Sequence, residues 1–334
     1  MDTTIIAMPL LIGLIALALA FDFLNGLHDA ANSIATVVST RLLSPVKAVI
    51  FAAFFNFAAY FVFGLKVAET IGSGIIDKDI VDPQVIFGAL VGAMFWNVLT
   101  WIKGIPSSSS HALIGGLVGA GVTRAGFDGV VWSGVLKTAS AIFLSPMIGL
   151  AVSMLIMLVT SWAFVRATSR TAEGAFKKLH LLSSAAYSLG HGANDAQKTM
   201  GIIAVLLYSQ GLLGSEFSVP GWVVLSCYVA ISLGTLSGGW KIIETMGTRI
   251  TKLSHHQGFS ASAGGSIMLF TATGLGIPVS TTHTITGCVV GVGAARRPSA
   301  VRWGVAGRIV IAWFITIPAS AAVGALFYWI TTWF

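Results

Sequence analysis

The stretch Gly26-Leu27-His28-Asp29-Ala30-Ala31-Asn32 decides the fold, because a related stretch, Gly192-Ala193-Asn194-Asp195-Ala196-Gln197-Lys198, follows about half a chain later. Both stretches lie inside long apolar segments. Ionisable side chains at membrane depth are costly and usually functional, and duplicated halves with Gly-interrupted or Pro-interrupted apolar segments are typical of binding sites in membrane carriers. The pair therefore predicts one functional site built by two repeated halves.

A second pair of related stretches carries hydroxyl side chains: Gly104-Ile105-Pro106-Ser107-Ser108-Ser109-Ser110-His111 and Gly276-Ile277-Pro278-Val279-Ser280-Thr281-Thr282-His283. In both, the Ser/Thr cluster follows a Pro and precedes an apolar helical run, so it should lie at a helix N-terminus. Free backbone N–H groups, the positive end of the helix dipole and hydroxyl donors converge there and can bind an oxyanion. Ordinary N-capping is the alternative, and the duplication favours a binding site.

The composition predicts an all-α, polytopic membrane protein. Of the 334 residues, 55% are apolar and 9% are charged, and the mean hydropathy is +0.88; an average soluble domain has about 25% charged residues. The first apolar stretch lacks a basic start, so we expect a retained helix rather than a cleaved signal. The two cysteines lie in apolar segments, which favours neither a disulfide framework nor a metal cluster. The net charge of +7 is interpreted as belonging to cytoplasmic loops, not to a nucleic-acid site.

We expect about ten hydrophobic helical elements, some of them broken or re-entrant. They lie near residues 4–43, 46–65, 84–102, 104–124, 132–165, 181–209, 222–240, 259–275, 277–295 and 303–333. The first and the sixth should be interrupted at Asn25–Asn32 and Gly190–Thr199, where the duplicated motifs fall. The longest polar link, 166–180, separates the two halves.

The two halves are repeats of one another. Matching residues keep their order, and the offsets differ only by loop lengths: an offset of 166 residues relates Asp29 to Asp195, 172 relates Gly104 to Gly276, and 175 relates Lys66 to Lys241. We therefore divide the chain into a first inverted repeat (1–165), a basic cytoplasmic linker (166–180) and a second inverted repeat (181–334).

The charges of corresponding loops predict that the repeats are inverted. Loop 66–82 is acidic on balance, whereas its counterpart 241–257 is basic. Loop 41–47 is basic, whereas its counterpart 210–221 carries only Glu216. Because basic loops stay on the cytoplasmic side, equivalent loops should face opposite sides of the membrane. Five elements per half, an odd number, require the same arrangement. We therefore expect a multi-pass protein of the cell inner (plasma) membrane with both termini on the outer side.

Inverted repeats should bring the paired motifs together near the bilayer midplane. Asp29 and Asp195 would repel a bare anion, so a cation must lie between them and the anion. A carboxylate at a Gly-containing break can coordinate Na⁺ together with unwound backbone carbonyls, or it can accept a proton. Capping of the following half-helix by each Asp is the structural alternative, and it is compatible with this role.

Three further polar side chains complete the predicted site. Asn32 and Gln197 supply neutral donors close to the aspartates. Lys198 occupies the repeat position of Asn32 and is interpreted as a tethered ammonium, which balances the charge of the anion or stands where a mobile cation would be held. A lysine that snorkels to the membrane surface is the alternative.

These four motifs resemble those of the PiT-type inorganic phosphate transporter family, most closely its short bacterial, low-affinity branch, over nearly the whole chain. The resemblance implies phosphate symport with a cation, an inverted-repeat fold with broken helices, and a homodimer. The residues that we expect to bind phosphate are Ser107, Ser108, Ser109, Ser110, Gln197, Lys198, Ser280, Thr281 and Thr282. The residues that we expect to serve the coupling ion are His28, Asp29, Asn32, Asn194 and Asp195.

The chain departs from the family pattern near the coupling site. His28 stands where the fuller pattern has Asn, as Asn194 still does. Asn56 and Ser262 align with positions at which many sodium-coupled relatives have Glu. The two missing acids and the presence of Lys198 favour proton coupling, with a neutral metal–phosphate complex as a further form of the substrate, while sodium stays open. Histidine has a near-neutral reference pKa, which suits proton handling, although a buried, hydrogen-bonded His is commoner.

Other functions remain open at this point. The same scaffold could carry sulfate or a related oxyanion, and an anion channel is a less favoured alternative. Two intramembrane Asp residues could form an aspartyl-protease dyad, or Ser and His a serine protease. A protease does not need a duplicated Ser/Thr cluster, so we expect no enzyme and no cofactor. We therefore predict a secondary transporter that works by alternating access.

Overall fold

The computed structural model describes residues 6–75, 81–214 and 217–333, and within them the chain folds into helices. The first half contains α1 (Met8–Ser39), α2 (Pro45–Ala58), α3 (Lys66–Gly74), α4 (Pro83–Lys103), α5 (Ser109–Ala125) and α6 (Trp132–Ala163). The second half contains α7 (Ser169–Ser209), α8 (Gly221–Ser237), α9 (Trp240–Glu244), the π-helix η3 (Thr245–Arg249), α10 (His255–Gly274), α11 (Thr281–Arg296) and α12 (Trp303–Thr331). The expected all-α fold class is confirmed. Residues 76–80 and Glu216, which contribute to the loop-charge argument, lie outside the described residues.

Local sequence signals form two helical hairpins with hydroxyl-rich tips. Gly104 and Gly276 have φ of 64° and 68°, a conformation that glycine adopts without strain, and they end α4 and α10. A few residues later, Ser108 and Ser280 cap α5 and α11 by accepting a hydrogen bond from the backbone N–H three residues on. The hairpins α4–α5 and α10–α11 therefore present the N-termini of α5 and α11 at their tips.

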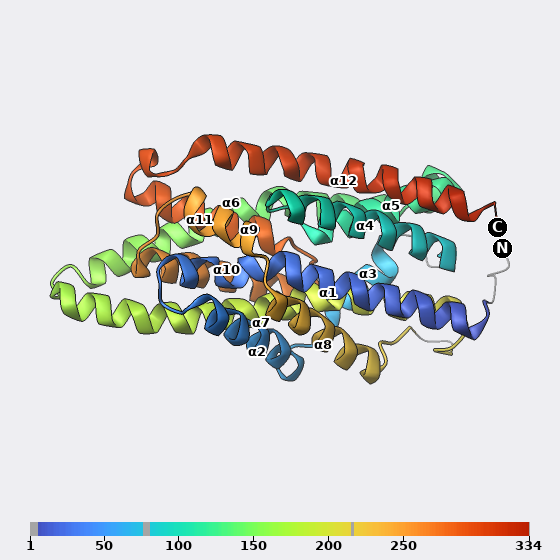
Figure 1. The fold of residues 1–334 in the computed structure, drawn as a ribbon, viewed down its shortest axis with the longest axis horizontal. Coiled ribbons are helices and arrows are strands. Elements are labelled where there is room, and N and C mark those ends of the chain that lie inside the picture. The colour runs from blue at the N-terminus through green and yellow to red at the C-terminus, as the bar shows by residue number, and fades with distance from the viewer. Residues whose placement is uncertain (1–5, 76–80, 215–216, 334) are drawn as a thin grey trace.

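The two halves interlock through equivalent helix contacts. α5 packs against α12, and reciprocally α11 packs against α6. Likewise α1 packs against α8, and α7 packs against α2. α1 starts at the end of the molecule where both termini lie, whereas α7 starts at the opposite end, so the two repeats run in opposite directions (Figure 1). Each half therefore lacks a complete set of packing partners of its own.

Equivalent hydrogen bonds also tie each short helix to the hairpin tip of the other half. Thr70 Oγ1 on α3 donates to the backbone oxygen of Gly276 at 2.8 Å. Thr245 Oγ1 on η3 donates to the backbone oxygen of Gly104 at 2.9 Å. The repeat offsets of 175 and 172 residues convert one bond into the other. The sequence repeat is therefore a repeat in three dimensions.

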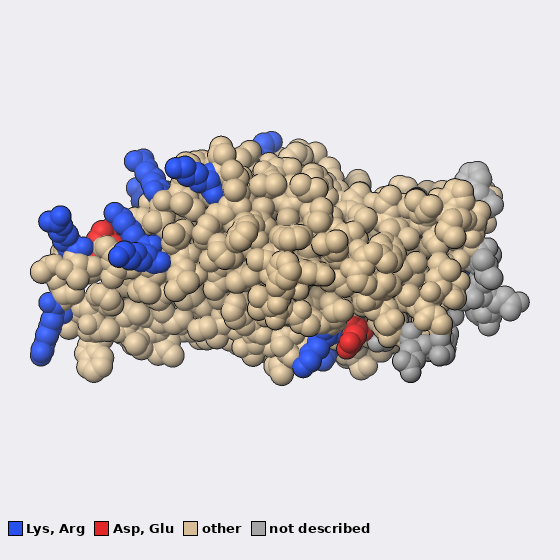
Figure 2. All heavy atoms as spheres, turned by 90° about the horizontal axis from the view of Figure 1, so that it is seen from below, with Lys and Arg blue, Asp and Glu red and all other residues tan. Residues whose placement is uncertain are grey.

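The helices differ in whether they are long and apolar enough to cross a membrane. α1, α4, α6 and α12 are each long and apolar enough to cross a membrane. Two bent pairs, α2 with α3 and α8 with α9 and η3, pass the same test together and turn by 85° and 68°, so up to six spans occur among the described residues. On the face shown in Figure 2, most Lys and Arg side chains gather at the end opposite to the termini.

The expected interruptions of the motif helices are wrong. α1 and α7 run unbroken through Asn25–Asn32 and Gly190–Thr199. The glycines of the motifs serve close packing instead of unwinding, because a side chain on Gly26 would overlap the carbonyl oxygen of Ile231 on α8. On α7, a side chain on Gly192 would likewise overlap the backbone of α2.

Breaks occur elsewhere in the two halves. They lie between α2 and α3 and, at the equivalent place, between α8 and α9. The stretches 66–82 and 241–257, treated above as loops, therefore include short helices. The link 166–180 is also largely helical, because α7 begins at Ser169.

Replacing Gly119 should weaken the packing of α5 on α12. A Cβ atom there would overlap the carbonyl oxygen of Ala321, so Gly119→Leu must push the two helices apart. Overpacking of this kind costs roughly 1–3 kcal/mol. We expect the purified variant to melt at a lower temperature in detergent than the parent protein. The control is Gly13→Leu, since no atom lies within 4 Å of a Cβ built at Gly13; equal melting of the two variants would contradict the close contact.

Candidate functional site

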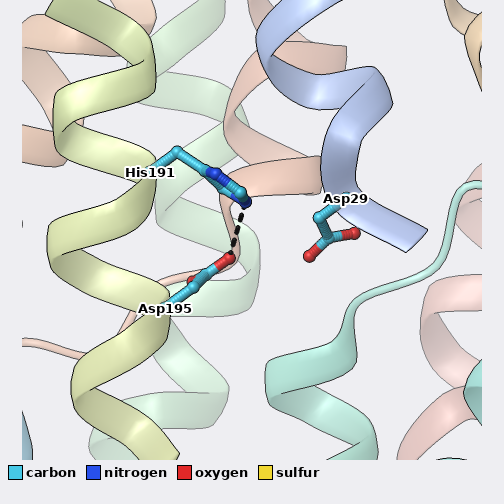
Figure 3. A group of neighbouring side chains, drawn as sticks. All are labelled: Asp29, His191 and Asp195. Atoms are coloured by element: carbon cyan, nitrogen blue, oxygen red, sulfur yellow. Dashed lines mark ion pairs between the residues drawn. The ribbon is translucent and has the colours of Figure 1, made fainter. Parts of the chain in front are cut away.

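Asp29 and Asp195 meet where α1 and α7 run side by side. Their side chains are 2% and 0% exposed. Both carboxyl groups point into the space between the two helices, with the His191 ring beside them (Figure 3). The donor atoms of Asp29, His191 and Asp195 all lie within 4.8 Å of one another. The structure thus brings the two aspartates of the duplicated motif together, as inverted repeats require.

Asp29 receives hydrogen bonds from both hairpin tips. Thr282 Oγ1 donates to its Oδ1 at 3.1 Å, and Ser109 Oγ donates to its Oδ2 at 3.3 Å. His28 Nδ1 lies 2.9 Å from the same Oδ1, and its Nε2 lies 3.1 Å from Thr100 Oγ1 on α4. One carboxyl group therefore holds the N-terminal turns of α5 and α11 together.

Asp195 is paired with a buried ammonium. Lys198 Nζ lies 2.5 Å from Asp195 Oδ1, and Thr281 Oγ1 donates to Oδ2 at 3.0 Å. His191 Nε2 lies 3.2 Å from the same Oδ2. Lys198 is 2% exposed, so it does not snorkel to the surface. A charge this deeply buried needs such a partner, because desolvation of an unpaired ion is costly.

Lys198 and Asn32, which occupy equivalent repeat positions, both donate hydrogen bonds to the hydroxyl side chains. The Lys198 ammonium donates to Ser110 Oγ at 2.5 Å and to the backbone oxygen of Val279 at 2.9 Å. The Asn32 amide donates to the hydroxyls of Thr281 and Thr282 at 3.1 and 3.0 Å. Lys198 therefore links the two hairpin tips, whereas Asn32 ties α1 to the second tip.

These side chains form one closed cluster, which we call the cage. Its members are Asp29, Asn32, Ser109, Ser110, Asp195, Lys198, Thr281 and Thr282. Each of them is at most 5% exposed, so the cage is shut off from solvent on both sides. The positive ends of the α5 and α11 dipoles border it.

Three of the predicted hydroxyls lie beside the cage and shape its walls. Ser108 and Ser280 are used as helix caps. Ser107 Oγ donates to Thr100 Oγ1 at 2.9 Å and lies 3.4 Å from His28 Nε2. These contacts fix the hairpin tips and the ring of His28.

Two predicted amides brace neighbouring segments. Asn194 Oδ1 accepts the backbone N–H of Val279 at 3.3 Å, which holds the second hairpin tip against α7. Gln197 Oε1 accepts the backbone N–H groups of Val67 and Ala68 at 2.9 and 3.3 Å, so it caps the start of α3. The structure therefore places Gln197 on the far side of α7 from the hydroxyl donors that Asp195 and Lys198 contact.

Sequence reasoning missed residues that position the cage. His191 Nδ1 lies 3.1 Å from Asn56 Oδ1 on α2, and the Tyr187 hydroxyl donates to the backbone oxygen of Thr281 at 2.9 Å. Tyr187, His191, Asp195 and Lys198 follow one another at spacings of four, four and three residues. Such spacings put side chains on one face of a helix. A helical interpretation of the second motif, instead of a broken one, would have identified them.

The cage combines donors for an anion with acceptors for a cation. The Ser and Thr hydroxyls, the Lys198 ammonium and the two helix N-termini suit an oxyanion. The carboxyl groups of Asp29 and Asp195, with the imidazole of His191, suit a proton or a small cation. In the closed cage the hydroxyls donate to the carboxyl groups themselves. An anion that bound to these hydroxyls would therefore compete with the carboxyl groups for them.

The chain is similar to known proteins over nearly its whole length. Residues 25–324 match the family described as "Phosphate transporter family". A probable low-affinity inorganic phosphate transporter of Rhizobium meliloti (strain 1021) is 66% identical over 328 residues, which is 98% of each chain. Its counterpart in Bacillus subtilis (strain 168) is 43% identical over 332 residues, 97% of this chain and 98% of its own. A solved structure, "The sodium-dependent phosphate transporter", matches 98% of this chain and 100% of its own, with a TM-score of 0.89 and 28% identity.

Removal of the Lys198 charge alone should destabilise the fold more than removal of the whole ion pair. Lys198→Met leaves the Asp195 carboxylate buried without its ammonium, a change that typically costs about 3–5 kcal/mol. The double variant Asp195→Asn/Lys198→Met removes both charges and should recover most of the loss. The measurement is thermal unfolding of the purified proteins in detergent.

The control for this comparison is Lys177→Met, which breaks a pair with Glu173 that is about half exposed on both sides and 3.5 Å long. Exposed pairs contribute about 1 kcal/mol or less, so this variant should melt close to the parent protein. If the double variant proved as unstable as Lys198→Met, the buried pair would not be the source of the stability.

Proposed function

The chain belongs to the phosphate transporter family, and on that premise we propose that it imports inorganic phosphate by cation symport, with alternating access at the cage. As a member of this family it is a transporter and not an enzyme, which removes the protease alternatives. The names of its relatives favour phosphate over sulfate as the transported oxyanion.

One observation carries this proposal: the hydroxyl donors of both hairpin tips are bound by the two carboxyl groups. Thr282 and Ser109 donate to Asp29, and Thr281 donates to Asp195. Hydrogen bonds to an ionised carboxylate are about twice as strong as neutral ones, so these hydroxyls are not free for phosphate while the carboxylates are charged. Neutralising the carboxylates weakens those bonds and releases the hydroxyls to a phosphate oxygen.

Coupling follows from the same contacts. Phosphate binds well only when a cation or proton has neutralised Asp29 and Asp195, because an anion beside two buried carboxylates is otherwise repelled. Lys198 contributes a fixed positive charge and reaches Ser110 at one hairpin tip and Val279 at the other. It takes the place of one mobile cation.

A proton is the favoured coupling cation, and sodium is the second candidate. Where many sodium-coupled relatives have Glu, Asn56 holds His191 and Thr235 by neutral hydrogen bonds, and Ser262 lies 3.2 Å from Thr36. Neither position offers a charged ligand for Na⁺. Sodium stays a candidate because the solved relative is named sodium-dependent. A neutral metal–phosphate complex is a further form in which the substrate could enter.

We place the protein in the cell inner membrane with both termini outside. Support comes from the Lys and Arg side chains that gather at the end opposite to the termini, as the positive-inside rule requires of a cytoplasmic end (Figure 2). The closed cage corresponds to an occluded step between the outward-open and inward-open states. The interlocked halves would then rock against each other around it.

Replacing either aspartate by asparagine should abolish phosphate uptake. Asp29→Asn and Asp195→Asn remove the group whose neutralisation couples the cation to phosphate binding, while the side-chain size stays the same. Uptake of labelled phosphate by cells that express each variant should fall to the background level, with normal amounts of protein in the membrane. Glu173→Gln, an exposed carboxyl change on α7, is the control and should transport normally. Normal uptake by both aspartate variants would remove these residues from the mechanism.

A pH gradient alone should drive uptake. Proteoliposomes that contain the purified protein, with an acidic outside and no sodium, are expected to accumulate phosphate. A sodium gradient at equal pH should add little, because neither Asn56 nor Ser262 offers a charged ligand for sodium. The readout is labelled phosphate inside the vesicles, with a protonophore as control. Strict dependence on sodium would reject proton coupling and leave phosphate transport itself intact.

A further inference from the structure

Asp22 is a third carboxyl group in the membrane interior, and it lies outside the cage. It belongs to α1, seven residues before Asp29, so it lies on the same helix face about 10 Å along the axis. Its side chain is 0% exposed, and neither carboxyl oxygen has a hydrogen-bond partner. Asp29 and Asp195 each have several donors. Asp22 is therefore surrounded quite differently from the cage carboxyl groups.

The surroundings of Asp22 are polar but do not supply the hydrogen bonds that a carboxylate needs. Asn25 and Thr199 interact with the carboxyl group, yet neither reaches hydrogen-bond geometry with its oxygens. Asn25 Oδ1, Thr199 Oγ1 and the hydroxyl of Tyr228 are also unpaired and buried. Groups of unpaired buried polar atoms are uncommon, and they indicate a bound species or a change of state during function.

The ionisable groups that face Asp22 come from α7 and α8. Asp195 and Lys198 act on it from α7, and they are already paired with each other at 2.5 Å. Cys227 and Tyr228 face it from α8. None of these four supplies a counter-charge that is free for Asp22.

The ionisable side chains of the other helices that contact α1 lie at positions along the α1 axis other than that of Asp22. The one ionisable residue of α4 is Lys103, which lies further along the helix than Thr100, the residue that contacts His28. The one ionisable residue of α2 is Lys47, in its first turn. The hydrogen bonds of α5, α10 and α11 to α1, and the close backbone approaches of Gly239 and Gly247 to α1, occur at Leu27 or later. Asp22 therefore has no cation from these helices at its own level.

Such surroundings favour a neutral carboxylic acid. Burying an ionised carboxylate without a counter-charge or hydrogen bonds is strongly unfavourable, and the group takes up a proton instead. When water reaches Asp22 the ionised carboxylate is stabilised again, because water hydrates the charge. Opening and closing therefore switch this group between holding and releasing a proton.

We propose that Asp22 binds a further coupling proton, besides the cation or proton that neutralises the cage carboxyl groups. The carboxylate takes up one proton from the outer aqueous phase, holds it on one oxygen while the cage is closed, and releases it to water when the carrier opens inward. Asp22 lies between Asp29 and the end of α1 at which both termini lie, which is the outer side in the proposed orientation (Figure 1). This step rests on the proton-coupled uptake proposed above.

The comparison of the two repeats supports a separate role for Asp22. An offset of 166 residues relates Asp22 to Ser188 and Asn32 to Lys198. In these two pairs, each half has an ionisable group where the other half has a neutral one. The second half contributes a fixed ammonium that is paired in the cage, and the first half contributes an unpaired carboxyl that can be loaded and unloaded.

The test is Asp22→Asn, which copies the size and neutrality of the protonated acid. In proteoliposomes, we expect phosphate accumulation driven by an imposed pH gradient to fall clearly below that of the parent protein, because one coupling proton is lost. Exchange of internal unlabelled phosphate for external labelled phosphate at equal pH should persist, because it needs no net proton movement. Asp22→Glu should restore part of the gradient-driven accumulation. Glu173→Gln is the matched control and should keep both activities.

The outcomes separate this proposal from the proposed function. If the parent protein accumulates phosphate with the pH gradient and Asp22→Asn does so equally, Asp22 does not carry the proton while proton coupling stands. If Asp22→Asn lost both phosphate exchange and phosphate accumulation, the proposal would also be overturned, because Asp22 would then serve phosphate binding or folding. If the parent protein itself ignores the pH gradient, the proposed proton coupling fails and the role of Asp22 fails with it.

Discussion

Two carboxyl groups held at the centre of a membrane protein are the constraint on which the rest of the structure depends. An ionised carboxylate in such a place is unfavourable by several kcal/mol, to order of magnitude, unless donors surround it. Asp29 obtains its donors from Ser109 and Thr282, one from each half of the chain. Asp195 obtains its donors from Lys198 and Thr281. The Lys198 bond to Ser110 then ties the second half back to the first.

This constraint explains why the halves are interlocked instead of lying side by side as separate bundles. The helix N-termini that carry the hydroxyls must reach the aspartates at the centre, so each hairpin tip is anchored by the short helix of the opposite half. Small residues allow the close approach, as at Gly26 against α8 and Gly192 against α2. The backbone follows a twofold pattern, whereas the charges do not. Lys198 has Asn32 as its repeat partner, and Asp22 has Ser188, so the two halves carry different charges at equivalent positions.

The sequence was sufficient to predict the helical membrane class, the repeat and the residues at the centre, because duplicated polar motifs in apolar segments leave few alternatives. It misled about the conformation of those motifs. Gly26 and Gly192 were interpreted as points of unwinding, but both lie in unbroken helices that pass another backbone closely. Gln197 points to the start of α3, and no local pattern indicates which side of α7 it faces in the packed fold. Asp22 was missed because a single acid outside a motif becomes conspicuous only once its lack of partners can be seen.

The most direct test of the central claim is to locate the oxyanion itself. Crystals of the protein grown with arsenate, a tetrahedral analogue of phosphate that scatters anomalously, would give the position of the arsenic atom independently of any assumed mechanism. We expect one anomalous peak between the N-terminal turns of α5 and α11, within hydrogen-bond reach of Ser110, Thr281 and the Lys198 ammonium. The contrary result is a peak outside the cage, with no anion facing the two aspartates, in a protein that is shown to transport arsenate. The cage would then not be the oxyanion site.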